Sequence, residues 1–390
     1  MPKKHFLLLL LVLFRVTPQV AAQDLSNNAT VSILTCQEGN ELYSIYGHTA
    51  IRIKDSANAL DVVYNYGTFD FNTEHFYLKF VKGDLRYFVT AYTFNDFYFE
   101  YTIENRSIYE QELRLTVAQK KMLFERLNQS LQSDAKYYTY KFIDRNCTNM
   151  VVDKINMALG QRCIVKTTEP DLSYRQILFP YLKNHFYENL GINILFGYKT
   201  DQKGDKLFLP NQLMESLKVA TFEGKSISGA PKTLLNATRV PEQHSLWNNI
   251  YTLSLFLLLL VVVRKAWVYL IFFSIVGLLG VFLSLVGFYS LHEELALNYN
   301  VLLFNPLLLL LLVFYSTKNY AWLKKTVQFC IVLDMVFFLM LLNKPNLLMF
   351  LPLLISMLLM LFYFFKLSNR GLLTPVKKDG AEGFENNIDI

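Results

Sequence analysis

Apolar residues dominate the chain from Leu246 to residue 370, in five stretches separated by short polar breaks. Each stretch approaches the roughly 20 residues that an α-helix needs to cross a bilayer, although the third is short. Asp334 interrupts the fourth, and an ionisable residue inside a span normally faces a helix bundle or a cavity. We therefore expect an all-α, five-helix transmembrane domain over 246–370. The expected spans are 247–263, 267–288, 299–315, 323–342 and 347–365.

Charged residues in the breaks predict how these spans are oriented. Basic residues occupy alternate breaks: Arg264 and Lys265, then Lys318, Lys324 and Lys325, then Lys366 and Arg370. The other breaks hold the segment 292–294, with two glutamates, and the turn 343–346. Since cytoplasmic loops carry the excess of lysine and arginine, residues 371–390 are expected as a cytoplasmic tail and residues before 246 on the opposite side. The net charge of +6 then mostly reflects topology, and we expect no nucleic-acid partner.

The first residues of the chain have the organisation of a secretory signal peptide. Two lysines precede an apolar run, and Val20-Ala21-Ala22 provides small residues for cleavage. Residues 1–22 are therefore expected to be removed. A cleaved signal places the following domain outside the cytoplasm, the same orientation that the loop charges predict.

Residues 23–221 are long enough for one globular domain with a core of its own. Aromatic and β-branched residues predict strands over 61–67 and 86–92, and alternation predicts another over 137–143. An amphipathic pattern predicts a helix over 117–131. Residues 222–245, with several glycines, serines and prolines, are expected to form a linker to the membrane. The predicted fold class is an α+β domain followed by the all-α membrane domain.

Two segments of the predicted α+β domain contain a pattern typical of a cysteine nucleophile. His48 lies on an alternating strand, so that it shares one face with Ala50 and Arg52 while the other face is packed. Cys147 opens a helix for which Asn146 is a good N-cap. The positive end of a helix favours a thiolate, and a neighbouring imidazole favours it further. Cys147 is therefore the candidate nucleophile and His48 its base.

Three further polar residues each have two interpretations. Asn65 either orients the imidazole, as in a Cys-His-Asn arrangement, or simply ends a strand. Cys36 and Cys163 lie in an oxidising compartment and either form a disulfide or remain buried thiols. The cysteines and histidines are scattered without the spacing of metal ligands, so we expect no metal and no cofactor.

The order of the motifs resembles a known family. They are Tyr46-Gly47-His48-Thr49-Ala50, Tyr64-Asn65-Tyr66-Gly67, Asn146-Cys147-Thr148, Phe208-Leu209-Pro210, and the stretch from His292 through Asn298-Tyr299-Asn300 to Asn305-Pro306-Leu307. In this order the chain resembles proteins with an Lnb N-terminal periplasmic domain. Their fold is the permuted papain-like fold of the NlpC/P60 and lecithin-retinol acyltransferase type. The chain departs from the retinol-acyltransferase pattern at Thr148-Asn149, where that group often has an acidic residue and histidine, and it has no second histidine shortly after His48.

The resemblance implies a lipoprotein N-acyltransferase in the inner membrane, multi-pass, with its catalytic domain in the periplasm. An acyl chain would pass through a Cys147 thioester to the N-terminal amine of a diacylated lipoprotein. The expected partners are a phospholipid acyl donor, the lipoprotein acceptor and the membrane. A cysteine peptidase or amidase acting on peptidoglycan, and a non-catalytic membrane scaffold, remain as alternatives.

Several residues are candidates for substrate contact under this interpretation. Near the proposed active face they are Tyr46, Tyr64 and Phe69. Phe69 and the neighbouring Phe71, Phe76, Tyr77 and Phe80 either belong to the sheet core, or line an acyl-chain groove or dip into the membrane interface. In the loop 291–300 they are His292, Asn298 and Asn300, which either lie in a solvated loop or receive lipid headgroups or the acceptor peptide.

Overall fold

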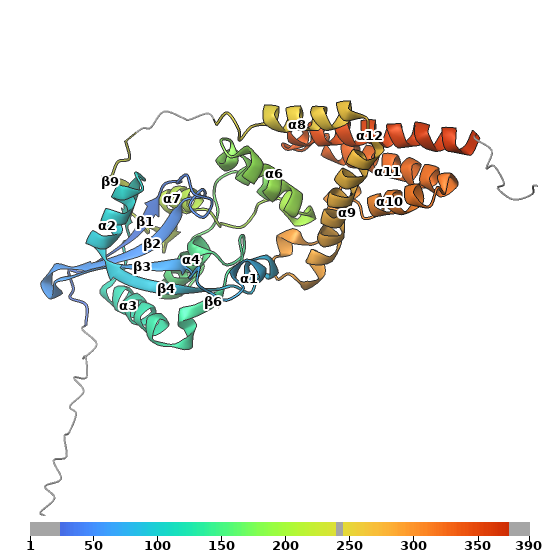
Figure 1. The fold of residues 1–390 in the computed structure, drawn as a ribbon. Helices are drawn as coiled ribbons and strands as arrows, with labels where there is room; N and C mark the ends of the chain where they lie inside the picture. Colours follow the sequence, from blue (N-terminus) through green and yellow to red (C-terminus); the bar gives the residue numbers. More distant parts are fainter. Residues whose placement is uncertain (1–23, 239–244, 374–390) are drawn as a thin grey trace, which may run out of the picture.

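The computed structural model describes residues 24–238 and 245–373, without the side chains of Tyr77 and Leu373. An N-terminal region of mixed α/β structure is followed by a C-terminal helical region (Figure 1). The predicted signal peptide, residues 1–22, and the predicted tail from residue 374 onward fall outside the described residues.

An antiparallel sheet lies at the centre of the N-terminal region. In the described chain it has seven strands in the order β6-β4-β3-β2-β1-β5-β9. They are β1 (Thr30–Cys36), β2 (His48–Asp55), β3 (Leu60–Thr68), β4 (Arg86–Thr93), β5 (Ile108–Glu112), β6 (Tyr137–Thr139) and β9 (Lys232–Leu235). The strands predicted over 61–67 and 86–92 are confirmed. The strand predicted over 137–143 ends at Thr139, because Lys141 and Arg145 exchange backbone hydrogen bonds and turn the chain before Cys147.

Helices cover both faces of the central strands. Helices α3 (Val117–Gln132), α4 (Cys147–Leu159) and α7 (Pro210–Val219) pack on the face that carries Ile33, Ile51 and Ile53. Helix α2 (Phe94–Ile103) packs on the other face, against Leu34, Ala50 and Val63. The predicted amphipathic helix α3 is confirmed. The face of β2 that carries His48 is packed as well, since α2 covers it at Ala50, and His48 itself is half-buried at the start of the strand.

Part of the predicted linker is an edge strand of the sheet. Residues 232–235 form β9, which pairs with β5, and β7 (Thr221–Phe222) pairs with β8 (Lys225–Ser226). Leu234 and Leu235 pack against the α2 core, and this apolar contact fixes a segment whose composition resembles that of a loop. Residues 239–244, at the end of the predicted linker, lie outside the described residues.

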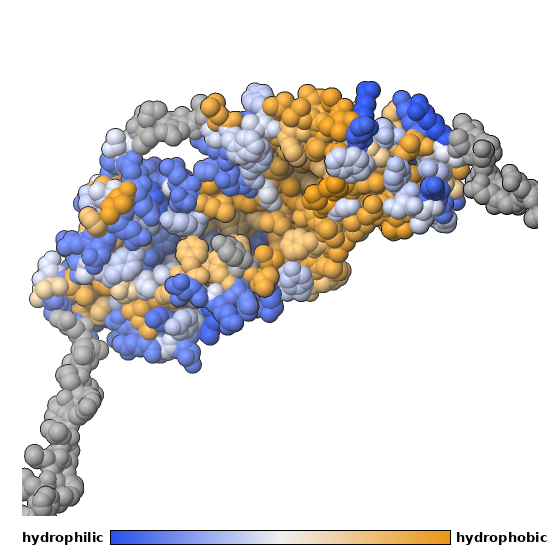
Figure 2. All heavy atoms as spheres, viewed as in Figure 1, coloured by the Kyte–Doolittle hydropathy of each residue, from blue (hydrophilic) through white to orange (hydrophobic). Residues whose placement is uncertain are grey.

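The described helical region contains five α-helices. They are α8 (Ile250–Val263), α9 (Ala266–Tyr289), α10 (Leu308–Ser316), α11 (Tyr320–Leu341) and α12 (Leu347–Leu373). By length and composition, residues 266–289 and 347–372 are able to cross a membrane, and α8 is a shorter apolar helix. Figure 2 shows apolar side chains concentrated over this region, whereas hydrophilic ones cover much of the α/β region. The third predicted span is not one helix, because residues 299–302 form a 3-10 turn and the α-helix begins only after Pro306, which has no backbone N–H.

The two ends of the helical region differ in charge and in what they contact. At the basic end, the Lys324 ammonium lies 5.5 Å from the ring of Phe365, and Tyr320 packs beside Gly371. At the other end, the loops 290–300 and 342–346 contact the α/β region, where Lys344 pairs with Asp201 at 2.6 Å. The basic breaks and the α/β region therefore lie at opposite ends of the helices, in the arrangement that the loop charges predict.

A pair of cysteine substitutions tests this sidedness. Ser316 and Asn343 are exposed at the two ends of the helical region. We expect Asn343→Cys to react with a membrane-impermeant maleimide in spheroplasts, and Ser316→Cys to react only after the membrane is opened. The unsubstituted chain gives the background from its own cysteines, and labelling of Ser316→Cys alone in intact spheroplasts would reverse the assigned orientation.

Candidate active site

Cys147 is the first residue of α4, and a reciprocal pair of asparagines fixes the start of this helix. Asn146 Oδ1 accepts the backbone N–H of Asn149 at 3.1 Å, and Asn149 Oδ1 accepts the backbone N–H of Asn146 at 3.0 Å. The Nδ2 group of Asn146 also donates to the carbonyls of Phe142 and Phe208, at 2.8 Å each. The predicted N-cap is confirmed, and the Phe208-Leu209-Pro210 motif supplies one of the carbonyls that hold it.

His48 begins β2 and is held by a chain of polar groups on the neighbouring strands. Asn65 on β3 donates through Nδ2 to the hydroxyl of Tyr92 on β4 at 2.8 Å, so its Oδ1 faces His48. A carbonyl oxygen only accepts, and therefore His48 Nε2 carries the hydrogen and donates to Asn65 Oδ1. The remaining ring nitrogen, Nδ1, is left for the thiol. Gly47 allows the strand to start here, since a Cβ at its φ of 79° would lie 2.7 Å from the Cys36 carbonyl oxygen.

The Cys147 thiol and the His48 ring are hydrogen-bonded to each other. Burial raises the pKa of Cys147, but the positive charge and hydrogen bond of His48, with hydrogen bonds from Thr49 and Thr148, outweigh it and lower the pKa below that of a free thiol. Burial lowers the pKa of His48, while the thiolate and the hydrogen bond to Asn65 raise it above its usual value. The pair therefore favours the thiolate and imidazolium forms, as an activated nucleophile requires.

Gly67 lies over this pair and leaves the approach to the thiol open. It sits at an irregularity in the pairing of β3 with β4, and its φ is 100°. A Cβ at this position would lie 3.6 Å from Cys147 Cβ and 3.8 Å from His48 Cε1. Gly67 is a site residue without a specific signal of its own in the sequence, although a glycine within a strand pattern often marks a bulge or a close approach.

Residues 17–178 match the model of the Lnb N-terminal periplasmic domain, and this range contains Cys147, His48 and Asn65. This match confirms the resemblance that the order of the motifs predicts. No curated protein and no solved structure matches the chain. The family and the apolar helices together indicate a membrane protein with a periplasmic domain.

The aromatic residues expected to contact substrate lie at different depths in the α/β region. Tyr46 is half-buried, with its ring centroid 5.2 Å from that of Phe142. Tyr64 is buried in the core beneath α3, where its hydroxyl donates to Asn128 at 2.6 Å, so the expectation that it contacts substrate is wrong. Phe69 follows Gly67 by two residues, and its ring centroid lies 5.2 Å from that of Tyr87.

Asn298 and Asn300 do not face solvent, and the expectation that they bind substrate is wrong. Both are buried against the end of α6 (Phe186–Leu195). Asn298 Nδ2 donates to the carbonyls of Ile194 and Leu195, and Asn300 Nδ2 donates to those of Asn193 and Ile194, all at 2.8–2.9 Å. Because the last carbonyls of a helix have no partner within the helix, the two asparagines cap α6 from the helical region.

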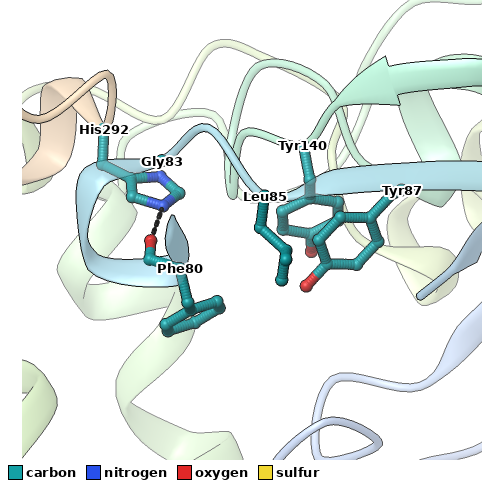
Figure 3. Close-up of a pocket in the computed structure, with 6 residues that line it drawn as sticks. All are labelled: Phe80, Gly83, Leu85, Tyr87, Tyr140 and His292. Carbon is teal, nitrogen blue, oxygen red and sulfur yellow. Dashed lines mark hydrogen bonds between the residues drawn. The ribbon is translucent and has the colours of Figure 1, made fainter. Parts of the chain in front are cut away.

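The loop 292–294 contacts both α1 (Phe76–Lys82) and the turn before Cys147. His292 is half-buried, and its Nε2 lies 3.0 Å from the carbonyl oxygen of Phe80 (Figure 3). Buried Glu294 accepts the backbone N–H of Ile143 at 3.3 Å. The Lys199 ammonium donates to a carboxylate oxygen of Asp144 at 2.6 Å and to one of Glu293 at 2.7 Å. None of these long-range polar contacts has a local signal in the sequence.

Cys36 and Cys163 are both free thiols. Cys36 packs against the α2 core, whereas Cys163 packs against the core on the other side of the sheet, so the predicted alternative of a disulfide is not realised. Burial raises the pKa of Cys36 to about 12, which leaves it protonated and unreactive at neutral pH. Among the described residues, no group of three or more His, Cys, Asp or Glu side chains is placed to hold a metal ion.

The lowered pKa of Cys147 predicts a distinctive pH profile for its alkylation. The thiolate forms at a lower pH than in a free thiol, so the rate of modification by iodoacetamide should rise at a lower pH for Cys147 than for a free thiol. In His48→Ala the burial remains while the compensating charge is lost. The profile should then move to higher pH, with about tenfold slower alkylation at neutral pH for each unit of pKa. Site-resolved mass spectrometry measures the rates, and an unchanged profile in His48→Ala would remove His48 as the partner of Cys147.

Substitution of Gly67 tests whether its missing side chain keeps the thiol accessible. Gly67→Ala places a methyl group against Cys147 and His48, and Gly160→Ala introduces similar backbone strain at a φ of 75° with no atom within 4 Å of the new Cβ. Both should lose about 1–3 kcal/mol of unfolding free energy. Only Gly67→Ala should slow alkylation of Cys147, more for a bulky maleimide than for iodoacetamide. Equal slowing in both variants would attribute the effect to strain alone.

Proposed function

We propose that the protein is a lipoprotein N-acyltransferase of the inner membrane. Its periplasmic domain would have the permuted papain-like fold, held at the membrane surface by five spans. The observation that carries this proposal is the arrangement of Cys147, His48 and Asn65 in a domain fixed by hydrogen bonds to an apolar helical region. A Cys-His-Asn site is suited to acyl transfer through a thioester.

In the first step, the Cys147 thiolate attacks the ester carbonyl of a phospholipid. A bond forms between Sγ and the carbonyl carbon, and the backbone N–H groups at the start of α4 stabilise the oxyanion. The ester C–O bond then breaks, and the His48 imidazolium gives its proton to the departing alkoxide. The products are a lysophospholipid and the Cys147 thioester.

In the second step, the free α-amine of a diacylated lipoprotein attacks the thioester. His48, now neutral, accepts the proton of the amine as the new C–N bond forms. The C–S bond breaks, and Cys147 leaves as the thiolate beside the imidazolium. The product is an amide, and the enzyme returns to its starting state.

The helical region supports a lipid substrate over a soluble one. Donor and acceptor would both be anchored in the bilayer, so a catalytic domain held at its surface meets them at a high effective concentration. A peptidase acting on peptidoglycan would use the same three residues, but it needs no broad polar contact between its catalytic domain and a helical membrane region. A scaffold has no use for a thiol whose pKa is lowered by a histidine.

The proposal predicts a trapped acyl-enzyme. Full-length protein in phospholipid vesicles should gain the mass of one acyl group on Cys147, and hydroxylamine should remove it. A diacylated lipopeptide with a free amine should then receive the chain. An N-acetylated lipopeptide should not, since its nitrogen has no nucleophilic lone pair. Intact-protein and lipopeptide mass spectrometry measure both steps.

Matched variants decide between the competing functions. Cys147→Ala should lose acylation, whereas Cys163→Ala, which removes a thiol outside the site, should retain it. Cleavage of muropeptides with an unchanged lipopeptide would establish the peptidase instead. Absence of any modification of Cys147 with either substrate class would favour a scaffold.

A further inference from the structure

A cluster of large apolar side chains is exposed beside the helical region. It comprises residues 69–82, which include α1 (Phe76–Lys82), and we call it the aromatic arm. Phe71 is 64% exposed, Leu78 70% and Phe80 46%. The ring centroids of Phe71 and Phe76 are 5.1 Å apart, and those of Phe76 and Phe80 are 6.5 Å apart. The arm therefore presents a connected apolar surface to its surroundings, on the side of the α/β region that faces the helices (Figure 1).

The aromatic arm is attached to the end of α9, one of the two helices able to cross a membrane. The backbone N–H of Leu291 donates to the Lys82 carbonyl at 2.7 Å, and the Ser290 hydroxyl donates to the Val81 carbonyl at 2.8 Å. His292 packs so closely on Gly83 that a Cβ there would lie 3.0 Å from its ring. Since α9 ends at Tyr289, these contacts hold the arm at the level where α9 would leave the bilayer.

An apolar path connects the aromatic arm to the nucleophile. Phe80, Gly83, Leu85, Tyr87, Tyr140 and His292 line a shallow apolar crevice, too narrow in this structure to hold a water molecule (Figure 3). The ring centroids of Tyr87 and Tyr140 are 4.3 Å apart, and Tyr87, Tyr140 and Cys147 all pack in the same apolar core. The ring of Tyr87 also contacts that of Phe69, with centroids 5.2 Å apart. Phe69 follows Gly67 by two residues, and Gly67 lies over the Cys147 side chain.

We propose that the aromatic arm enters the outer half of the bilayer beside α9 and takes up one acyl chain of the donor phospholipid. The chain then lies over the crevice between Phe80 and Tyr87, with its ester at Cys147. Aromatic side chains are favoured at the membrane interface, and an acyl chain that leaves the bilayer needs an apolar surface throughout. This inference rests on the proposed function, since it assigns the acyl donor's position at the same site.

Two donors separate the role of the arm from the chemistry at Cys147. The full-length protein is placed in vesicles of ether-linked phospholipid, which has no ester to transfer. The ester donor is either a long-chain phospholipid mixed into the vesicles or a short-chain phospholipid dissolved below its micelle concentration. Acylation of Cys147 is followed by intact-protein mass spectrometry.

The arm variant is Phe71→Ser/Leu78→Ser, which leaves Phe80 in place. Its control is Phe99→Ser/Ile103→Ser, which removes side chains 65% and 68% exposed on α2, away from the helical region. We expect the arm variant to be acylated at least about tenfold more slowly by the bilayer donor, a loss of about 1.4 kcal/mol of transition-state stabilisation, and at the wild-type rate by the dissolved donor. The control should match the wild type with both donors.

The alternative outcomes overturn the inference in distinguishable ways. Equal acylation of wild type and arm variant by the bilayer donor would show that the arm takes up no chain. Equal slowing with both donors would show that the arm only supports the fold of the site. If the wild type is acylated by neither donor, the proposed function fails and the acyl path fails with it.

A readout without catalysis tests membrane entry directly. Cys147→Ala in vesicles that contain a photoactivatable diazirine phospholipid should be labelled on peptides covering residues 71–82 as well as on α9. Labelling of α9 without these peptides would show that the bilayer does not cover the arm. Cross-links from the arm to a second copy of the chain would assign it to a protein contact instead.

Discussion

A buried thiolate is stable in this fold only while a positive charge stands beside it. Burial raises the pKa of Cys147, and the charge and hydrogen bond of His48 more than offset it. Most of the polar architecture around the site serves to fix these two side chains. The asparagine pair sets the start of α4, the Asn65 and Tyr92 side chains set the His48 ring, and the hydroxyls of Thr49 and Thr148, 3.2 Å apart, join β2 to α4. Removing any one of these contacts would loosen the geometry that makes the charge pair favourable.

The residues that could be predicted are those whose signal is local. An N-cap asparagine before a helical repeat predicted the position of Cys147, and strand alternation predicted that of His48. The pattern also predicted α3, β3 and β4. The position of the basic breaks, at the end of the helices away from the α/β region, was predictable too. The rule for loop charges needs only the order of the spans along the chain.

What could not be predicted depends on partners that leave no local pattern. Asn298 and Asn300 donate to backbone carbonyls of α6, and a carbonyl is present at every residue, so the sequence offers no pairing signal. The glycines and prolines near β9 predict a loop rather than an edge strand. The segment forms a strand because Leu234 and Leu235 pack against the α2 core. Gly67 belongs to one of the sequence motifs, but its place at the site depends on its φ of 100° and on the nearby side chains of Cys147 and His48, which come from distant segments.

The contacts between the two regions determine where the site lies relative to the helices. Glu294 holds the amide of Ile143, and Lys199 bridges Asp144 and Glu293, so the turn that leads into Cys147 is bonded to the loop after α9. Glu294 is buried, and an unpaired carboxylate there would be costly, which makes the separation of the two regions unfavourable. The position of Cys147 relative to the helices is therefore set by these bonds and by the asparagine caps on α6.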